Sequence, residues 1–358
     1  MVRPPEYVSA IEPYVPGKPI EELERELGIK GSVKLASNEN PAGPSRKAVE
    51  ALTPEVMGAL NRYPDGGAFY LTRALAERHG VSEDQIILGN GSNELIDIAV
   101  RTFMRPGDEA VMAWPSFVVY PMSVQAQGCR GVRVPLRDFR HDLAKMAEAV
   151  TEKTKMVFVA NPNNPTGTIN TRDEFDGLME GMPEGVLVLV DEAYFEYVES
   201  ADYADAMKHM RSGRNVLALR TFSKIYGLAG LRIGYGVTRP EIARDMNRLR
   251  EPFNTNSLAQ AAALAALSDT GHVERSKRIN GEGKAYLYRE LDALGIRYVP
   301  TEANFIFMFP GKPSAEVYGA LLKRGVIVRP MGEDSIRVTI GLPEENKRFI
   351  EGMKAVLI

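Results

Sequence analysis

Short apolar runs alternate with stretches of helical pattern from residue 86 onward, and this alternation narrows the possible folds more than any other feature. Several runs are apolar on both faces, as expected of strands buried between two layers of helices. The pattern therefore predicts an α/β fold with a mostly parallel seven-stranded sheet between helices. The predicted strands are 86–88, 110–113, 132–134, 156–160, 186–190, 216–219 and 232–236.

The pattern changes near residue 245, which predicts a second, smaller α+β domain. A long helical stretch from about Gly271 to Leu294 precedes three candidate strands at 304–308, 325–329 and 335–339. A chain of 358 residues also exceeds what one hydrophobic core usually serves. The predicted division is a proline-rich N-terminal arm over 1–30, a large domain over 31–245 and a small C-terminal domain over 246–358.

Composition argues against several classes of function. The net charge is -3 without a basic stripe, which disfavours nucleic acid as a partner. One cysteine, Cys129, allows neither an internal disulfide nor a thiolate metal site, and the four histidines lack ligand spacing, so no metal is predicted. No signal peptide and no apolar run long enough for a membrane are apparent, so a cytoplasmic location is expected.

Lys224 follows the predicted strand 216–219, in Arg220-Thr221-Phe222-Ser223-Lys224. Its amine therefore lies at the carboxyl end of a strand, where open α/β sheets bind their ligands. Burial would lower the pKa of the amine and make it a nucleophile. Hydroxyls of Thr221 and Ser223, with the guanidinium of Arg232, could hold a phosphate beside it. An amine next to a phosphate site suggests pyridoxal 5′-phosphate; a surface lysine after a strand is the alternative.

The strand predicted over 186–190 ends at Asp191, whose carboxylate could pair with a protonated pyridine nitrogen and keep the ring cationic. Tyr194 and Asn164 could both donate to the phenolic oxygen of such a ring. Asp191 could instead be a helix N-cap, and turn chemistry alone could explain the segment 160–167 around Asn164.

The segment Gly89-Asn90-Gly91-Ser92-Asn93-Glu94 follows a strand and opens a helix. Glycine allows a phosphate to approach, and the N–H groups at the helix start attract it, which makes Gly91, Ser92 and Asn93 candidates. The segment is not a dinucleotide fingerprint, because position 94 is Glu, and Ser92 could be a plain N-cap. Phe117 could stack on a cofactor ring or simply pack in the core.

Arg337 lies in the apolar alternation of 335–339, where its planar guanidinium would suit a carboxylate. Arg329 ends another apolar run and could meet a second anion. An arginine on an edge strand facing water is the alternative for each.

Together and in this order, these segments resemble the fold-type I pyridoxal-phosphate aminotransferases of class I and II, from about Val33 to the C-terminus. The most specific pieces are Asn163-Asn164-Pro165-Thr166-Gly167, Asp191-Glu192-Ala193-Tyr194, and Ser223-Lys224 with Arg232. A pyridoxal-phosphate decarboxylase or lyase on the same fold remains an alternative. A nicotinamide oxidoreductase is disfavoured because its phosphate fingerprint is missing.

Four further segments resemble the histidinol-phosphate aminotransferase family: Ile11 to Gly17, Leu35 to Pro41, Arg62-Tyr63-Pro64 and Pro252-Phe253-Asn254. This resemblance implies transamination of L-histidinol phosphate with 2-oxoglutarate, giving imidazole-acetol phosphate and L-glutamate, in histidine biosynthesis. An aromatic amino acid aminotransferase acting on phenylalanine or tyrosine is the alternative.

The resemblance also implies a role for individual residues. Lys224 would bond the cofactor aldehyde, Asp191 would pair with the pyridine nitrogen, and Asn164 and Tyr194 would contact the phenolic oxygen. The phosphate would be held by Gly91, Ser92, Thr221, Ser223 and Arg232, and Asn93 would also contact the cofactor. Phe117 would stack on the ring, where the family often has tyrosine. Arg337 would bind the substrate α-carboxylate; Tyr14, Asn254 and Arg329 would face the substrate phosphate, and Asn40 would also contact substrate. Tyr63 would reach the neighbouring subunit's cofactor, which implies a homodimer with shared sites.

Overall fold

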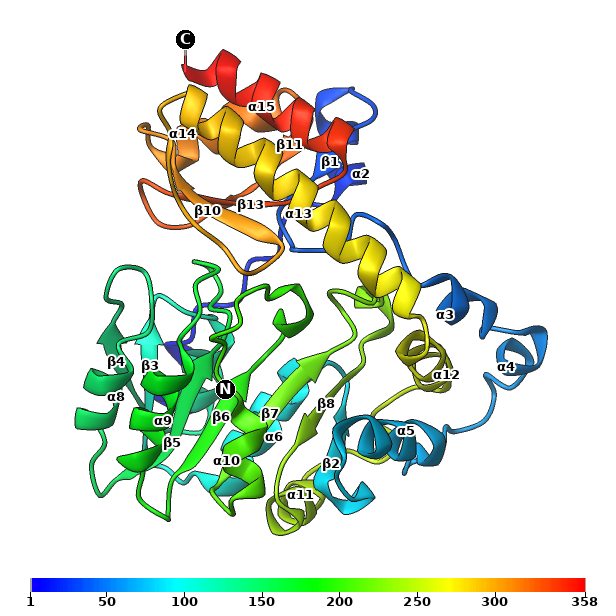
Figure 1. Cartoon of the computed structure of the whole chain (residues 1–358), viewed down its shortest axis with the longest axis vertical. Helices are drawn as coiled ribbons and strands as arrows, with labels where there is room; N and C mark the ends of the chain where they lie inside the picture. Colours follow the sequence, from blue (N-terminus) through cyan, green and yellow to red (C-terminus); the bar gives the residue numbers. More distant parts are fainter. Residues whose placement is uncertain (1, 358) are drawn as a thin grey trace.

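The computed structural model describes residues 2–357 and contains a large sheet with helices on both faces and a smaller sheet with helices packed against it (Figure 1). The long helix α13 (Thr270–Ala293) runs from the larger part to the smaller one, with the C-terminal helix α15 (Pro343–Leu357) beside it. The predicted α/β class with a smaller C-terminal domain is therefore confirmed.

The larger sheet has seven strands in the order β2-β8-β7-β6-β5-β3-β4. Only β8 is antiparallel to its neighbours, β2 and β7; the other pairs are parallel. Each strand coincides with one of the seven predicted runs. Their bounds are β2 Ile86–Gly89, β3 Glu109–Trp114, β4 Arg130–Pro135, β5 Thr154–Ala160, β6 Leu187–Asp191, β7 Val216–Thr221 and β8 Gly234–Val237.

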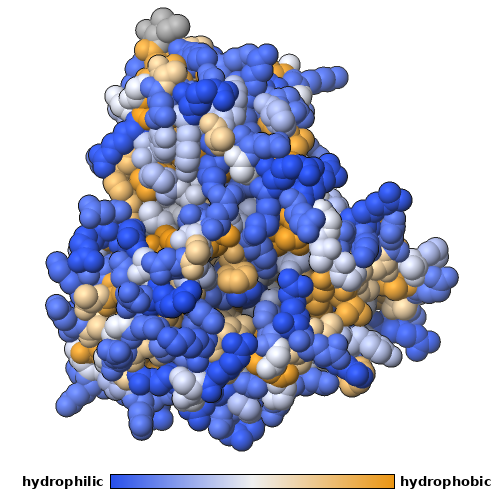
Figure 2. Space-filling view, viewed as in Figure 1, coloured by the Kyte–Doolittle hydropathy of each residue, from blue (hydrophilic) through white to orange (hydrophobic). Residues whose placement is uncertain are grey.

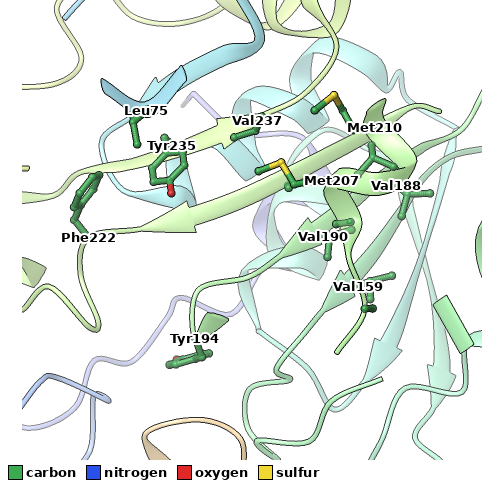
Figure 3. Close-up of a cluster of buried hydrophobic side chains, with 14 of the residues drawn as sticks. Leu75, Val159, Val188, Val190, Tyr194, Met207, Met210, Phe222, Tyr235 and Val237 are labelled. Carbon is green, nitrogen blue, oxygen red and sulfur yellow. The ribbon is translucent and has the colours of Figure 1, made fainter. Parts of the chain in front are cut away.

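Both faces of this sheet are buried, which explains why its central strands are apolar throughout. On β6, Val188 and Val190 face one core, which Figure 3 shows with Met207 and Met210 of α10 (Ala206–Arg211). Leu187 and Leu189 face the other core. Side chains alternate between the faces of a strand, so a helix layer on each face requires apolar residues at consecutive positions. Burying each such side chain contributes roughly 1.5–3 kcal/mol.

The helices of the larger part cover the sheet or extend beside it. They are α3 Arg46–Glu50, α4 Pro54–Gly58, α5 Phe69–His79, α6 Ser92–Phe103, α7 Val119–Ala126, α8 Leu143–Glu148, α9 Arg172–Glu180, α10, α11 Pro240–Asn247 and α12 Ser257–Leu267, with short 3₁₀ helices at Glu83–Gln85, Phe195–Tyr197 and Ala229–Leu231.

The smaller part contains an antiparallel sheet in the order β12-β13-β10-β9. The strands are β9 Arg297–Val299, β10 Phe305–Phe309, β12 Arg329–Pro330 and β13 Ile336–Thr339, with helix α14 Ser314–Leu322 beside them. The run predicted as one strand over 325–329 is divided: β11 (Val326–Ile327) pairs with β1 (Val33–Lys34), whereas β12 pairs with β13. Strand β9 was not predicted, because three residues are too short to establish a period of two.

The N-terminal segment and α12 each pack against parts distant in sequence. Helices α1 (Glu6–Ser9) and α2 (Ile20–Leu27) precede β1, and α2 ends at Gly28 in the left-handed conformation. Alanines of α12 pack in the core of the larger part, and α12 lies against α3 and α5. The division at residues 30 and 245 stays a prediction.

Among residues 2–357, no helix is long and apolar enough to cross a membrane. Within the same range, no three His, Cys, Asp or Glu side chains are grouped so that they could hold a metal ion.

Candidate active site

A cavity of about 870 Å³ lies where the carboxyl ends of β5, β6 and β7 meet the first turn of α6. Parallel strands that end at one edge bring together side chains distant in sequence. Most of the predicted site residues line this cavity: Tyr14, Ser92, Asn93, Phe117, Asn164, Asp191, Tyr194, Thr221, Ser223, Lys224, Arg232 and Arg337.

Lys224 extends from the loop after β7 into the cavity, and its Nζ donates to the backbone oxygen of Ser37 at 3.0 Å. Burial of the amine, followed by the charge of Arg337, lowers the pKa of Lys224 to about 8. Glu39 opposes this shift, and Arg232 adds to it. The unprotonated amine is therefore accessible near neutral pH, as a nucleophile or a general base requires.

Asp191 is the last residue of β6, and its buried carboxylate accepts two hydrogen bonds. Its Oδ2 accepts from the Tyr120 hydroxyl at 2.8 Å, and its Oδ1 accepts from the Ala193 N–H at 3.1 Å. Burial raises the pKa of Asp191, whereas both hydrogen bonds and the charge of Lys224 favour the ionised form. The N-cap alternative does not describe Asp191, because the N-cap of the following 3₁₀ helix is Tyr194.

Tyr194 and Asn164 are both oriented by side chains from elsewhere in the chain. The Tyr194 hydroxyl accepts from Nδ2 of Asn38 at 2.9 Å. The Asn164 Oδ1 accepts from Arg337, which leaves its Nδ2 group as the donor. Burial raises the pKa of Tyr194, so its hydroxyl stays protonated near neutral pH. Two donors thus lie near Lys224, as a phenolic oxygen would require.

The first turn of α6 and Arg232 form an anion site. Gly91, with φ of 80°, precedes the helix, and a Cβ there would lie 2.5 Å from Nη2 of Arg232. A Cβ at Gly234 would lie 2.4 Å from the backbone nitrogen of Ser92. Glycine at position 91 therefore lets Arg232 approach the helix N-terminus, and glycine at position 234 lets β8 lie close against it. Exposed helix N–H groups and a guanidinium together favour a phosphate group.

Arg337 lies on β13, is only 8% exposed, and donates to the backbone oxygen of Ala36 at 2.6 Å. Its buried Nε has no partner among the described residues. Directly across the strand pair, Arg329 lies opposite Arg337 and over the Tyr14 ring, 5.4 Å from its centre. Like charges placed opposite each other destabilise a sheet unless an anion compensates them. The pair therefore favours a second anion site, next to the cavity.

Three predicted residues lie outside the lining of this cavity. Tyr63 is 83% exposed and stacks on Phe253 with ring centres 4.7 Å apart. Asn40 donates to the backbone oxygen of Ile225 and to Ser276, and Asn254 donates to Glu94 and to the backbone oxygen of Leu88. The amides of Asn40 and Asn254 thus hold loops together here, and a substrate contact for either stays a prediction.

Sequence reasoning missed Tyr120 and Asn38. Tyr120 follows the candidate Phe117 by three residues and packs edge-on against it. In the sequence it therefore resembles a core residue, and nothing there indicates that its hydroxyl contacts Asp191. Asn38 lies in the segment Leu35 to Pro41, which contributed to the sequence analysis only through its resemblance to the family. Its left-handed φ of 55° carries no signal in a single sequence, although Asn adopts that conformation more readily than most residues.

Comparison with known proteins agrees with this geometry. The sequence model of the family described as aminotransferase class I and II matches residues 30–353. A histidinol-phosphate aminotransferase of Moorella thermoacetica is 53% identical over 98% of this chain and 92% of its own length. Histidinol-phosphate aminotransferase 1 of Nitrosococcus oceani is 49% identical over 98% of this chain and 95% of its own.

Solved structures extend the comparison. Histidinol-phosphate aminotransferase from Sinorhizobium meliloti, in complex with pyridoxal-5′-phosphate, superposes with a TM-score of 0.90 at 28% identity, covering 100% of this chain and 98% of that one. Thermus thermophilus aspartate aminotransferase with maleate shares the fold, with a TM-score of 0.86 at 23% identity and both chains fully covered. The chain therefore belongs to the class I and II aminotransferases and, within them, to the histidinol-phosphate aminotransferase family.

Proposed function

We propose that this cavity catalyses transfer of the amino group of L-histidinol phosphate to 2-oxoglutarate, giving imidazole-acetol phosphate and L-glutamate, a step of histidine biosynthesis. The observation that carries the proposal is the buried amine of Lys224 in one cavity with two arginines, Arg232 and Arg337. We infer that Arg232 suits the phosphate of a cofactor and Arg337 suits the anion of a substrate. The relatives named for this reaction match over nearly the full chain, so the aromatic amino acid alternative is not favoured.

The residues fit pyridoxal 5′-phosphate. Arg232 and the start of α6 would hold its phosphate, with Ser92, Asn93, Thr221 and Ser223 around it. Asp191 would pair with the ring nitrogen, and Lys224 would bond the aldehyde. When bound, this cofactor supplies a ring that withdraws electrons from the substrate carbon bearing the amine.

Lys224 is the residue we assign to proton transfer. Its Nζ would accept the proton of the substrate α-carbon, because the tether to the loop after β7 keeps the amine within reach. An ionised Asp191 would stabilise a proton on the ring nitrogen of the bound cofactor. Tyr194 and Asn164 would donate to its phenolic oxygen, and Phe117 would pack against its ring.

The facing arginines explain how one site would accept both substrates. Histidinol phosphate has no α-carboxylate, so its phosphate is its only strong anion, whereas glutamate and 2-oxoglutarate carry carboxylates. We assign the α-carboxylate to Arg337, and the substrate phosphate to Arg329 and Tyr14 with Arg337 beside them. A phosphate bearing up to two negative charges would compensate the repulsion between the two guanidinium groups.

Arg329→Ala is expected to lower kcat/KM for histidinol phosphate by about 10- to 100-fold, since a charged hydrogen bond to the phosphate is lost. The glutamate half-reaction of the same variant should change by less than about threefold, because Arg337 remains. Arg329→Lys is the matched variant that keeps the charge and loses the planar geometry. Equal losses for both substrates would remove Arg329 from phosphate recognition.

The homodimer is also part of the proposal. Exposed apolar side chains lie on or beside α4 and α5, two helices that both contact α12, and on the loop that precedes α12: Met57 (49%), Leu60 (57%), Tyr63 (83%), Tyr70 (73%) and Phe253 (45%). In the view of Figure 2, apolar residues gather over α12 and beside α4. Phe253 adjoins Asn254, which donates to Glu94 of the cavity wall, so this surface borders the anion site at α6. A second copy there would bring its own Tyr63 toward the cofactor phosphate.

Mixed dimers test the shared site directly. Lys224→Ala and Tyr63→Ala homodimers should both be impaired, and a purified heterodimer of the two should recover about half of the wild-type activity. Recovery follows because one site in the heterodimer keeps Lys224 from one copy and Tyr63 from the other. A heterodimer no more active than the Tyr63→Ala homodimer would place Tyr63 in its own subunit's site.

An amino-donor screen with 2-oxoglutarate tests the proposed reaction. Histidinol phosphate should exceed phenylalanine and tyrosine in kcat/KM, and keto-product and glutamate should form in equal amounts. Release of carbon dioxide or loss of another group without glutamate formation would indicate a lyase instead. The cytoplasmic location stays a proposal, which cell fractionation would test.

A further inference from the structure

The backbone of the segment 36–38 lies against two charged side chains of the cavity. Its Ala36 oxygen accepts from Arg337 at 2.6 Å, and its Ser37 oxygen accepts from Lys224 at 3.0 Å. The segment continues from β1, which pairs with β11 beside the smaller sheet. A short piece of backbone thus links that part of the fold to the amine on the larger sheet.

The third residue of this segment, Asn38, is 1% exposed, and both the Oδ1 and the Nδ2 of its amide form hydrogen bonds. Its Oδ1 accepts from the Thr339 hydroxyl at 3.3 Å, and the same hydroxyl accepts from the Asn38 backbone N–H at 2.9 Å. The Asn38 backbone oxygen accepts from Asn304 at 3.0 Å. These contacts leave Nδ2 directed at the Tyr194 hydroxyl, 2.9 Å away.

The direction of this hydrogen bond decides where the Tyr194 proton lies. An amide Nδ2 group can only donate, so the Tyr194 oxygen is the acceptor. The hydroxyl proton of Tyr194 must then point away from Asn38. The charged or titratable groups around Tyr194 include Arg337, Asp191, Tyr14, Tyr120, Tyr197 and Lys224. The Nζ of Lys224 lies 5.7 Å from the centre of the Tyr194 ring.

We propose that Asn38 is a positioning residue that directs the Tyr194 hydroxyl proton into the cavity, toward the phenolic oxygen of the bound cofactor. The inference rests on the proposed function and adds a residue to it. Because Thr339 and Asn304 hold Asn38, the direction of that proton depends on how the smaller sheet is seated against the larger part.

Two substitutions distinguish the effect of the Asn38 amide donor from the effect of the backbone path. Asn38→Gly removes the amide and suits the φ of 55°, so the segment keeps its path. Asn38→Asp keeps the shape but replaces the donor with an acceptor, which draws the Tyr194 proton out of the cavity. The readout is the pH midpoint of the visible absorption band of the protein loaded with pyridoxal 5′-phosphate.

Loss of a donor at the phenolic oxygen should make the neighbouring Lys224 nitrogen more basic. Asn38→Asp is therefore expected to raise the midpoint by about one pH unit, and Asn38→Gly by less. Tyr226→Phe is the control: it removes a buried hydroxyl that has no partner among the described residues, and it should leave the midpoint unchanged.

The same substitutions in a Tyr194→Phe background give the decisive comparison. There, the Asn38→Gly shift should vanish, and the Asn38→Asp shift should shrink to the effect of its added charge. Shifts of equal size with and without the Tyr194 hydroxyl would overturn the proposal, as would an unchanged midpoint in the Asn38 variants alone. Asn38→Gly suffices if Asn38→Asp does not fold. A wild-type protein without any visible band on adding the cofactor would contradict the proposed function itself.

Discussion

Lys224→Ala is expected to eliminate both the visible absorption of the cofactor-loaded protein and nearly all turnover. The substitution removes the amine that would bond the aldehyde and move the substrate proton, and general acid–base catalysis alone contributes about 10²- to 10⁴-fold. The expected loss in kcat is therefore at least about 10³-fold. Absorbance spectra and steady-state rates on the same preparation measure both effects.

Lys224→Arg is the matched variant for this experiment. Arginine keeps a cation facing the Ser37 oxygen but cannot lose its proton in a protein, so it should be as inactive as alanine. Lys153 is an exposed lysine at the amino end of β5, and the cavity lies at the carboxyl end of that strand. Lys153→Ala should therefore behave as wild type. A Lys224→Ala protein that kept its visible band would show that another amine carries the cofactor.

Asp191→Asn is expected to lower kcat by about 10²- to 10³-fold while the protein stays folded, because a preorganised charge at the ring nitrogen is lost. Asparagine has the same shape and can still accept from Tyr120 through its carbonyl oxygen. The unfolding temperature should thus change little while the rate falls. Stopped-flow measurement of the first half-reaction would isolate the chemical step from product release.

Asp173→Asn provides a comparison at an exposed aspartate in the first turn of α9. It should retain the wild-type rate. If Asp191→Asn did so as well, Asp191 would have no part in the mechanism. If it lost its fold, the buried carboxylate would be needed for stability rather than for the chemistry of the ring.

The large sheet could be predicted because burial on both faces demands consecutive apolar, often β-branched residues. The run Val186 to Val190 has that character, and β6 lies there. The strands of the smaller part were harder to predict from the sequence. Strands β9, β11 and β12 have only two or three residues each, too few for a period, and the change of partner between Ile327 and Arg329 depends on tertiary contacts.

The site was predicted to the extent that strand ends determine it. Asp191 ends β6 and Lys224 follows the adjacent parallel strand β7, so their meeting in one cavity follows from topology. The direction in which a side chain points does not follow from topology. Asn40 has the residue type of a ligand contact, yet its amide bonds Ile225 and Ser276. Tyr120 has the type of a core residue, yet its hydroxyl reaches Asp191.

The bond between Lys224 and the cofactor aldehyde is central to the proposed function, and borohydride reduction tests that bond directly. Reduction of the protein loaded with pyridoxal 5′-phosphate converts a lysine–aldehyde bond to a stable secondary amine, which peptide mapping by mass spectrometry then locates. The predicted result is a single modified residue, Lys224, with no modification in Lys224→Ala. A label on another side chain, or none in the wild-type protein, would contradict the assignment of this cavity.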